Sequence, residues 1–278
     1  MNQLVEATLQ DLIDKIENGT GDWLREWVGG GAPTNYTTRH HYHGINILLL
    51  WSAKVEAGYP TSQWATYKQW RDAGYQVRKG EKSSIIFINK DTVKKGGDKD
   101  NPDDHYRLFK CAFVFNAAQL EVAPPQAVGA GTANERIEEC ERTIKATCAQ
   151  IAEGGWPSYT LLADRIEVPP IGSFISAETY YATCFHELVH WTGNPKRLDR
   201  NMILDYAFEE LIAEFGAAIL CAEHGIVDLT ENAAAYIRAW LRKVKIEKGR
   251  ALLQAASAAS KAADFIMEKR TQLKEEAA

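Results

Sequence analysis

No stretch of the chain carries the roughly 18 consecutive uncharged apolar residues that a membrane-spanning helix needs. The best apolar run, Ile45 to Ala53, is about half that length and contains Asn46. The first 15 residues alternate Leu and Val with acidic residues, so they lack the basic start and the apolar centre of a signal peptide. We therefore expect a soluble protein of the cytoplasm that does not enter a membrane.

Cysteine is sparse and is not arranged as a covalent framework. The five cysteines are odd in number, widely scattered and without a Cys-x-x-Cys pair: Cys111, Cys140, Cys148, Cys184 and Cys221. This pattern argues against disulfides and against a cysteine-ligated metal, and it favours buried thiols. There is no internal repeat. With 278 residues, of which 45% are apolar and 25% charged, the chain can bury one large core or two smaller ones.

Charge is distributed unevenly although the net charge is only −5. Residues 1–120 hold 15 Lys and Arg against 14 Asp and Glu, whereas the rest of the chain holds 17 against 23. The segment from Trp64 to Lys95 is the most basic part, with eight basic and three acidic residues. A polyanion is therefore expected to bind the first part of the chain and to be repelled by the second.

A break in the pattern at Glu121 to Thr132, EVAPPQAVGAGT, indicates a linker. We predict a first domain over residues 1–122, a linker over 123–132 and a second domain over 133–278. In the first domain, helical spacing predicts an amphipathic helix up to Asn18 and helices over 44–56 and 66–72. Strands are expected over 84–89 and 106–115, joined by a polar hairpin tip.

The sequence predicts a mainly helical second domain. Its first helix is expected to include Ile137, Cys140, Ile144 and Ile151, and 159–168 followed by two prolines favours a short strand pair. Ser176 is a typical N-cap for the next helix and Gly193 a typical stop. Further helices are expected over 203–224, 232–246 and 250–274. The expected fold class is α+β, with antiparallel strands in a small mixed first domain.

The sequence His186-Glu187-Leu188-Val189-His190 lies within the helix that is predicted to begin near Ser176. A spacing of four residues places both imidazoles on one helix face, one turn apart, as a tetrahedral zinc site requires. Glu187 would then lie beside the metal and take a proton from a bound water. Apolar neighbours make this helix largely buried, and unpaired buried histidines would be costly, so we favour a metal site over two surface histidines.

The next helix, YAFEELIAEF, offers a third ligand. We predict Glu210, with Glu209 as the nearest competitor because the sequence does not fix the rotation of this helix. Glu214, one turn further on, is expected to accept the ring N–H of a ligating histidine. The metal would be zinc (Zn²⁺) or another divalent transition metal such as Mn²⁺. The group that stabilises an oxyanion stays open among four tyrosines: Tyr159, Tyr180, Tyr181 and Tyr206.

The first domain interleaves basic and aromatic residues, a pattern that suits single-stranded nucleic acid because cations neutralise phosphates while rings stack on unpaired bases. The structural alternative is that several of these rings belong to the core. The basic members are Arg39, Lys68, Arg71, Arg78, Lys79 and Lys82, and the aromatic members are Tyr36, Tyr42, Trp64, Tyr67, Trp70 and Tyr75. A further cluster, His40, His41 and His43, is interpreted as a polar loop.

Several long segments of the chain together carry a family resemblance. In the first domain they are WLREW (23–27), Pro33 with Asn35, YHGINILLLW (42–51), WATYKQWRDAGYQVRKGEKSSIIF (64–87) and FNAAQLE (115–121). In the second they are FHELVHWTG (185–193), RLDR (197–200), YAFEELIAEFGAAIL (206–220) and AAYIRAWL (234–241). In this order the segments resemble the plasmid-borne antirestriction proteins of the ArdC type. Between RLDR and YAFEE the chain has NMILD, where this family often carries a glycine-containing turn.

The resemblance implies an N-terminal domain that binds single-stranded DNA and a C-terminal zincin-like metallopeptidase domain, in a protein that shields plasmid DNA from host restriction. It carries DNA binding onto the polar members of the matching motifs: Tyr42, Asn46, Lys68, Gln69, Arg78, Lys79 and Lys82. Expected partners are single-stranded DNA and either a protein substrate or a host restriction enzyme; the oligomeric state is not determined by the sequence. The main alternative is a cytosolic zinc peptidase whose first domain recognises a protein substrate.

Overall fold

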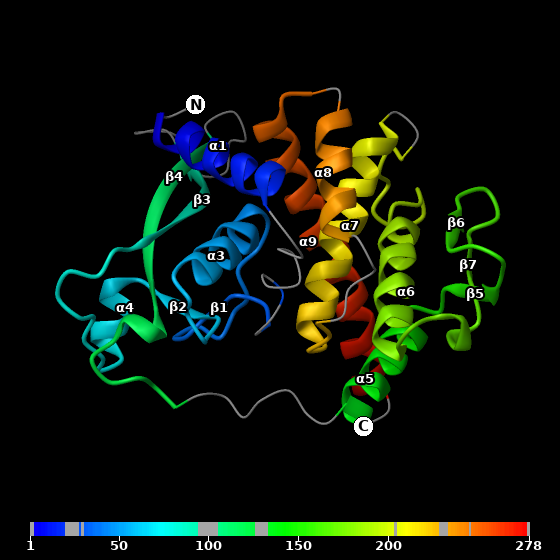
Figure 1. Ribbon diagram of the computed structural model, residues 1–278, viewed down its shortest axis with the longest axis horizontal. Coiled ribbons are helices and arrows are strands. Elements are labelled where there is room, and N and C mark those ends of the chain that lie inside the picture. Colours follow the sequence, from blue (N-terminus) through cyan, green and yellow to red (C-terminus); the bar gives the residue numbers. More distant parts are fainter. Residues whose placement is uncertain are drawn as a thin grey trace. The chain divides into compact units, whose positions relative to one another are not determined.

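The computed structural model of the chain divides into two compact units, which are described separately (Figure 1). The first is formed by Pro33–Pro125, and the second by Asn2–Ala32 together with Gln126–Ala278. Among the residues described, no helix is long and apolar enough to cross a membrane. The described residues are 3–19, 28, 31–93, 105–125, 133–202, 205–227, 233–244 and 246–276.

The first unit is built on a four-stranded sheet with the order β1-β2-β4-β3. Its largest part is the antiparallel pair β3 (Ser84–Val93) and β4 (His105–Asn116), in register from Ser84 opposite Val114 to Val93 opposite His105. Both strands were expected and both extend beyond the predicted limits. The short strands β1 (Thr34–Asn35) and β2 (Gln63–Ala65) pair in parallel. The predicted hairpin tip, 94–104, lies outside the described residues.

Two helices accompany this sheet, at the predicted places. Helix α3 (Ile45–Glu56) is tied to β3 by Asn46, whose amide donates to the Phe87 carbonyl at 2.8 Å and accepts from the Phe87 N–H at 2.7 Å. Helix α4 (Tyr67–Asp72) begins with a capping box in which Thr66 and Gln69 satisfy each other's backbone N–H groups. The 3₁₀ helix η2 (Ala117–Gln119) follows β4.

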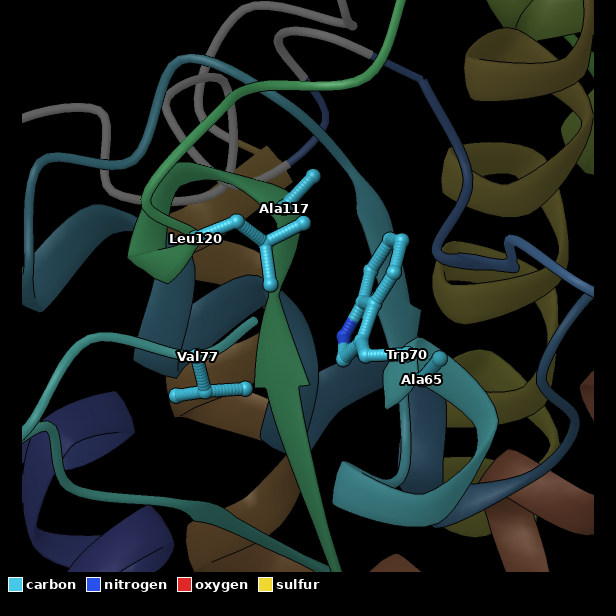
Figure 2. Close-up of a cluster of buried hydrophobic side chains, with 5 residues drawn as sticks. All are labelled: Ala65, Trp70, Val77, Ala117 and Leu120. Atoms are coloured by element: carbon cyan, nitrogen blue, oxygen red, sulfur yellow. The ribbon is translucent and has the colours of Figure 1, made fainter. Parts of the chain in front are cut away.

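Two apolar clusters form the core of the first unit. One consists of Ala65, Trp70, Val77, Ala117 and Leu120, and Figure 2 shows it packed around the end of β4. The other contains Leu50, Trp64, Ile86 and Val114. Most of the conspicuous rings of the basic segment are therefore structural.

The second unit is mainly helical, as predicted. Helix α6 lies between α7 and a three-stranded sheet, and α8 lies beside α7 (Figure 1). The sheet has the order β5-β7-β6. The elements are α1 (Gln3–Asn18), α5 (Ala133–Ala146), β5 (Gln150–Glu153), β6 (Ser158–Thr160), β7 (Arg165–Val168), η3 (Ile171–Ser173), α6 (Ala177–Thr192), α7 (Tyr206–Glu223), α8 (Ala233–Lys243) and α9 (Lys248–Glu276).

The helix expected to open the second domain is shorter than the sequence predicts. Helix α5 ends at Ala146 and Ile151 lies in β5, because Cys148 adopts a left-handed backbone conformation (φ 54°) that ends the turn. Helix α1 contacts α8 and α9 and is grouped with the second unit. Its buried residues are Val5, Leu9, Leu12, Ile13 and Ile16.

Candidate metal centre

Helix α6 presents both histidines of the HExxH motif on one face. It begins where predicted, with the Ser176 hydroxyl accepting from the Thr179 N–H at 3.1 Å, and it ends at the C-cap Gly193. The Nε2 atoms of His186 and His190 lie 3.2 Å apart. The helical spacing has therefore brought the two imidazole nitrogens to a common point.

Glu210 completes a group of three donors. Its carboxylate oxygens lie 3.5 Å from His190 Nε2 and 3.6 Å from His186 Nε2. Across the described part of the chain, this is the single group of three or more His, Cys, Asp or Glu residues that could hold a metal ion. In a tetrahedral zinc site with ligands at about 2.0–2.2 Å, donor atoms lie about 3.3–3.6 Å apart, so the observed spacing fits such an ion.

The close approach of α6 and α7 depends on Gly216. A Cβ atom at this position would lie 2.6 Å from Val189 Cγ2, which is nearer than real Cβ contacts. Val189 immediately precedes His190, and Gly216 lies less than two turns after Glu210. The glycine thus lets the helix that carries the carboxylate pack directly against the helix that carries the imidazoles.

Glu209 contacts the Nδ1 side of the His190 ring and is not part of the donor group. Its Oε1 lies 3.2 Å from His190 Nδ1 and accepts from the Arg200 guanidinium at 2.7 Å. Arg200 also donates to the Val189 carbonyl at 2.6 Å and to the Thr192 hydroxyl at 2.7 Å. A histidine whose Nδ1–H is bound to a carboxylate keeps Nε2 free for a metal. Sequence reasoning assigned no role to Arg200, whose position in the RLDR segment was the available signal.

Glu214 does not make the predicted hydrogen bond. Its Oε1 lies 3.8 Å from His186 Nδ1, which is too long for a hydrogen bond. The side chain is buried, and burial raises the pKa of this carboxyl to about 7. The contact expected between Glu214 and a histidine ring is instead seen between Glu209 and His190.

The carboxylates around His190 favour the protonated, positively charged form of its ring. Burial by itself lowers the pKa of His190, but its contacts with Glu209 and Glu210 reverse this effect and raise it to about 9. Burial likewise raises the pKa of Glu210, but hydrogen bonds with the two histidines hold it well below its ordinary value. A site that stabilises cationic imidazoles also suits a metal cation.

Glu187 lies beside the donors and is only 6% exposed. Burial raises the pKa of its carboxyl, while His186 and His190 lower it. A carboxylate that is held near a metal and has a raised pKa suits a general base.

These groups form the floor of a cavity of about 580 Å³ in the second unit. Tyr159 and Tyr206 line it, whereas Tyr180 and Tyr181 do not. The Tyr159 hydroxyl is bound to Asp164 at 2.9 Å and to Asn194 at 2.8 Å, whereas the Tyr206 hydroxyl is bound to Glu210, so Tyr206 is the tyrosine that reaches the donor group. The remaining lining residues are Pro157, Ser158, Leu161, Thr183, His186, Glu187, His190, Met202, Glu209, Glu210, Glu214, Tyr236 and Trp240.

The residues that were predicted to contact DNA fall into two groups in the first unit. Five cations are exposed: Arg39, Lys68, Arg78, Lys79 and Lys82. Two of them already have partners, because Arg78 pairs with Glu81 and donates to the Leu120 carbonyl at 2.9 Å, and Arg39 lies over the ring of Tyr36.

The other predicted contacts have structural roles. Trp64 is 0% exposed, so its ring cannot stack on a base while the unit keeps this conformation. Asn46 joins α3 to β3, and Gln69 belongs to the capping box of α4. The Tyr42 hydroxyl accepts from Asn35 at 3.2 Å. Tyr67, one of the aromatic members of the interleaved pattern, is 45% exposed.

Two family descriptions together match most of the chain. Residues 2–119 match the N-terminal domain of the anti-restriction factor ArdC, and residues 138–258 match a zincin-like metallopeptidase family. Among individual sequences, a protein of Sinorhizobium fredii designated y4eC is 33% identical over 280 residues, which cover 95% of this chain and 91% of that protein. The DNA primase TraC of Escherichia coli is 34% identical over 294 residues, but the match spans only 27% of its length.

Solved structures of an antirestriction protein match over nearly the full length. The metal-free crystal structure of ArdC from plasmid R388 is 35% identical, with a TM-score of 0.80, and the match covers 97% of this chain and 98% of that one. The Mn(II)-bound structure of the same protein is 36% identical, with a TM-score of 0.77 and coverage of 96% and 98%. The similarity therefore includes both units.

Proposed function

This chain belongs to the ArdC family of antirestriction proteins, and we propose that it protects DNA entering the cytoplasm from a host restriction enzyme. In this proposal the first unit binds single-stranded DNA, and the second unit holds a divalent metal, Zn²⁺ or Mn²⁺, at His186, His190 and Glu210. The antirestriction half is supported by the similarity to ArdC of R388 over both units. The observation that carries the second half is the convergence of these three donors next to Glu187.

The residues around the donors suit hydrolysis of a peptide bond. A divalent cation bound here would polarise a peptide carbonyl and lower the pKa of an attacking water. Glu187 accepts the proton of that water as its oxygen bonds to the carbonyl carbon, and it returns the proton to the amide nitrogen as the C–N bond breaks. Arg200 and Glu209 keep His190 oriented, and Tyr206 is the group available to hydrogen-bond the oxygen that gains charge.

The Glu187→Ala variant tests the enzymatic half. Because Glu187 is not among the donors, the variant should retain the metal, whereas cleavage of denatured protein substrates should fall at least about 100-fold. Metal content measured by mass spectrometry accompanies a protease assay with the intact and the chelated protein. Cleavage that survives both Glu187→Ala and chelation would contradict the proposal.

Antirestriction is tested separately with the same variant. If DNA binding suffices for protection, Glu187→Ala should protect an incoming plasmid from a restriction enzyme as well as the original protein does. Filter binding should show tighter retention of single strands than of duplexes, because exposed rings can stack only on unpaired bases. Equal retention of both, or none of either, would contradict the assignment of single-stranded DNA as the ligand.

A further inference from the structure

We propose that the cavity above the metal donors selects polypeptide segments that place a large aromatic or aliphatic side chain against a wall formed by Tyr206, Tyr236 and Trp240. The proposal rests on the proposed peptidase function and adds the class of substrate.

The aromatic wall is formed by two helices. Tyr206 is the first residue of α7, and Tyr236 and Trp240 lie four residues apart on α8, a spacing that places both rings on one helix face. The rings of Tyr206 and Trp240 meet edge to face, with centroids 5.3 Å apart. Such packing holds the rings in place, so the wall is already formed before a ligand arrives.

Two of these large aromatic side chains are strongly exposed to solvent. Tyr206 is 62% exposed and Tyr236 is 48% exposed, and both line a cavity of about 580 Å³. Pro157 and Leu161 add apolar surface from the β6 side of the same cavity. A side chain that contacts the rings would remove apolar surface of both partners from water, which is the main source of affinity in such clefts.

The charges of the cavity disfavour an acidic occupant at the aromatic wall. The described lining contains four carboxylates and no Lys or Arg, so its only cationic side chains are the two imidazoles of the donor group, which already contact Glu209 and Glu210. Outside the lining, the Arg200 guanidinium is bound to Glu209 at 2.7 Å, and Lys243 Nζ lies 4.6 Å from the centre of the Trp240 ring. Aromatic rings alone would suit a nucleic acid base as well, but the missing phosphate partners favour a polypeptide.

Binding of a matched peptide series tests this directly. The full-length Glu187→Ala protein, loaded with Zn²⁺ so that no peptide is consumed, is titrated into fluorescein-labelled alanine hexapeptides with Phe, Leu, Ala or Glu at one central position. Fluorescence anisotropy should show that the Phe peptide binds about tenfold or more tightly than the Ala peptide. The Leu peptide should fall between them, and the Glu peptide should bind no better than Ala. Equal affinities for Phe and Ala would overturn the proposal.

Variants of Tyr236 localise the preference. Tyr236→Ala should reduce the ratio of the Phe and Ala affinities to below about threefold, whereas Tyr236→Phe should retain it, because the apolar ring and not the hydroxyl makes the contact. Zn²⁺ content and far-UV circular dichroism confirm that both variants remain folded and loaded. The matched control is Tyr67→Ala, a tyrosine of the first unit with 45% exposure, which should leave the ratio unchanged. A Tyr236→Ala variant with an unchanged ratio would overturn the proposal.

Two further arms separate this inference from its alternatives. A labelled oligo(dT) should bind the Tyr236→Ala variant as it binds the original protein; weaker binding would identify the wall as a nucleic acid surface and overturn the proposal. Cleavage assays of the same peptides with the active protein test the proposed function independently. If the Phe peptide binds preferentially but no peptide is cleaved, the side-chain preference stands and the peptidase function is refuted. If the peptides are cleaved but bind with equal affinity, the peptidase function stands and the side-chain preference is refuted.

Discussion

At the scale of single residues, a row of hydrogen bonds runs from Arg200 through Glu209 to the ring of His190. Arg200 anchors the Glu209 carboxylate, and Glu209 in turn contacts His190 Nδ1 at 3.2 Å. Burial raises the pKa of Glu209, but its bonds with His190 and Arg200 keep it below the ordinary value, so the carboxylate stays charged. Arg200 and Glu209 are positioning residues for the donor nitrogen on the opposite side of the ring.

Replacing either positioning residue should weaken metal binding without removing a ligand. For Glu209→Gln and Arg200→Lys we expect the affinity for Zn²⁺ to fall about 10- to 100-fold, because the ring of His190 loses its fixed orientation. Competition with a fluorescent chelator measures the affinity. Arg142→Lys, a substitution at an exposed arginine of the same unit, is the control and should have no effect. Unchanged Zn²⁺ affinity in both variants would refute the role of Arg200 and Glu209 in orienting His190.

A second residue-scale network should make stability depend on pH. The Arg197 guanidinium beside Asp164 lowers the pKa of that carboxyl to about 2, below its value in an unfolded chain. A lowered pKa means that the stabilisation is present above about pH 4 and is lost as the pH falls toward 2. The metal-free Asp164→Asn variant should therefore be about 1–2 kcal/mol less stable than the original chain at pH 6 and nearly equal to it at pH 2, as measured by urea unfolding. A difference that does not change with pH would contradict this.

The sequence predicted the donor types and not their full arrangement. HExxH specifies that two imidazoles share a face, because that depends only on helical geometry, and the structure brings them together with Glu210. Glu209 and Glu210 are adjacent, so they point about 100° apart around the helix, and which of them faces the histidines depends on how α7 packs. That packing is a long-range contact between Gly216 and Val189, which no local pattern reveals.

At the scale of elements, the sequence predicted the helices and strands that are long or that have recognisable caps. Helices α1, α3, α4, α6, α7, α8 and α9 were anticipated because periodicity and caps are local signals, and so was the long pair β3–β4. Strands β1, β2 and β5 have two to four residues, too few for an alternating pattern. The end of α5 was missed because a left-handed turn was formed by Cys148 and not by a glycine.

The contact between α6 and α7 gives an element-scale prediction. Gly216→Ala inserts a methyl group where Val189 already lies, so the helices must separate, and we expect a loss of about 1–3 kcal/mol in the free energy of unfolding. Because the donors lie on these two helices, Zn²⁺ affinity should fall as well. Gly155→Ala has no atom within 4 Å of the added carbon and serves as the control. A Gly216→Ala variant with unchanged stability and affinity would show that the packing tolerates the methyl group.

At the scale of the whole molecule, the uneven charge distribution separates two kinds of ligand. The exposed cations of the basic segment belong to the first unit, whereas the carboxylate cluster belongs to the second. A polyanion and a polypeptide would therefore bind to different units without competing for the same surface. The predicted domain limits at 122 and 133 stay a prediction, and part of the linker lies outside the described residues.

Salt dependence tests the DNA half of this division. Each phosphate contact to a single strand contributes about 0.7 to the slope of log affinity against log salt, so Lys79→Ala with Lys82→Ala should reduce that slope by about 1.4. Lys145→Ala with Lys196→Ala removes the same charge from exposed positions of the second unit and should leave the slope nearly unchanged. Filter binding of oligo(dT) over a range of salt concentrations measures both. Equal slopes for the two double variants would show that the single-stranded DNA does not contact Lys79 and Lys82.

The single hydrogen atom that serves as the side chain of Gly216 has a consequence for ion selectivity. The contact of Gly216 with Val189 sets the separation of α6 and α7, and the separation of these helices sets the spacing of the donors. A substitution in this apolar seam, which removes no ligand, would therefore change which ion the site fits.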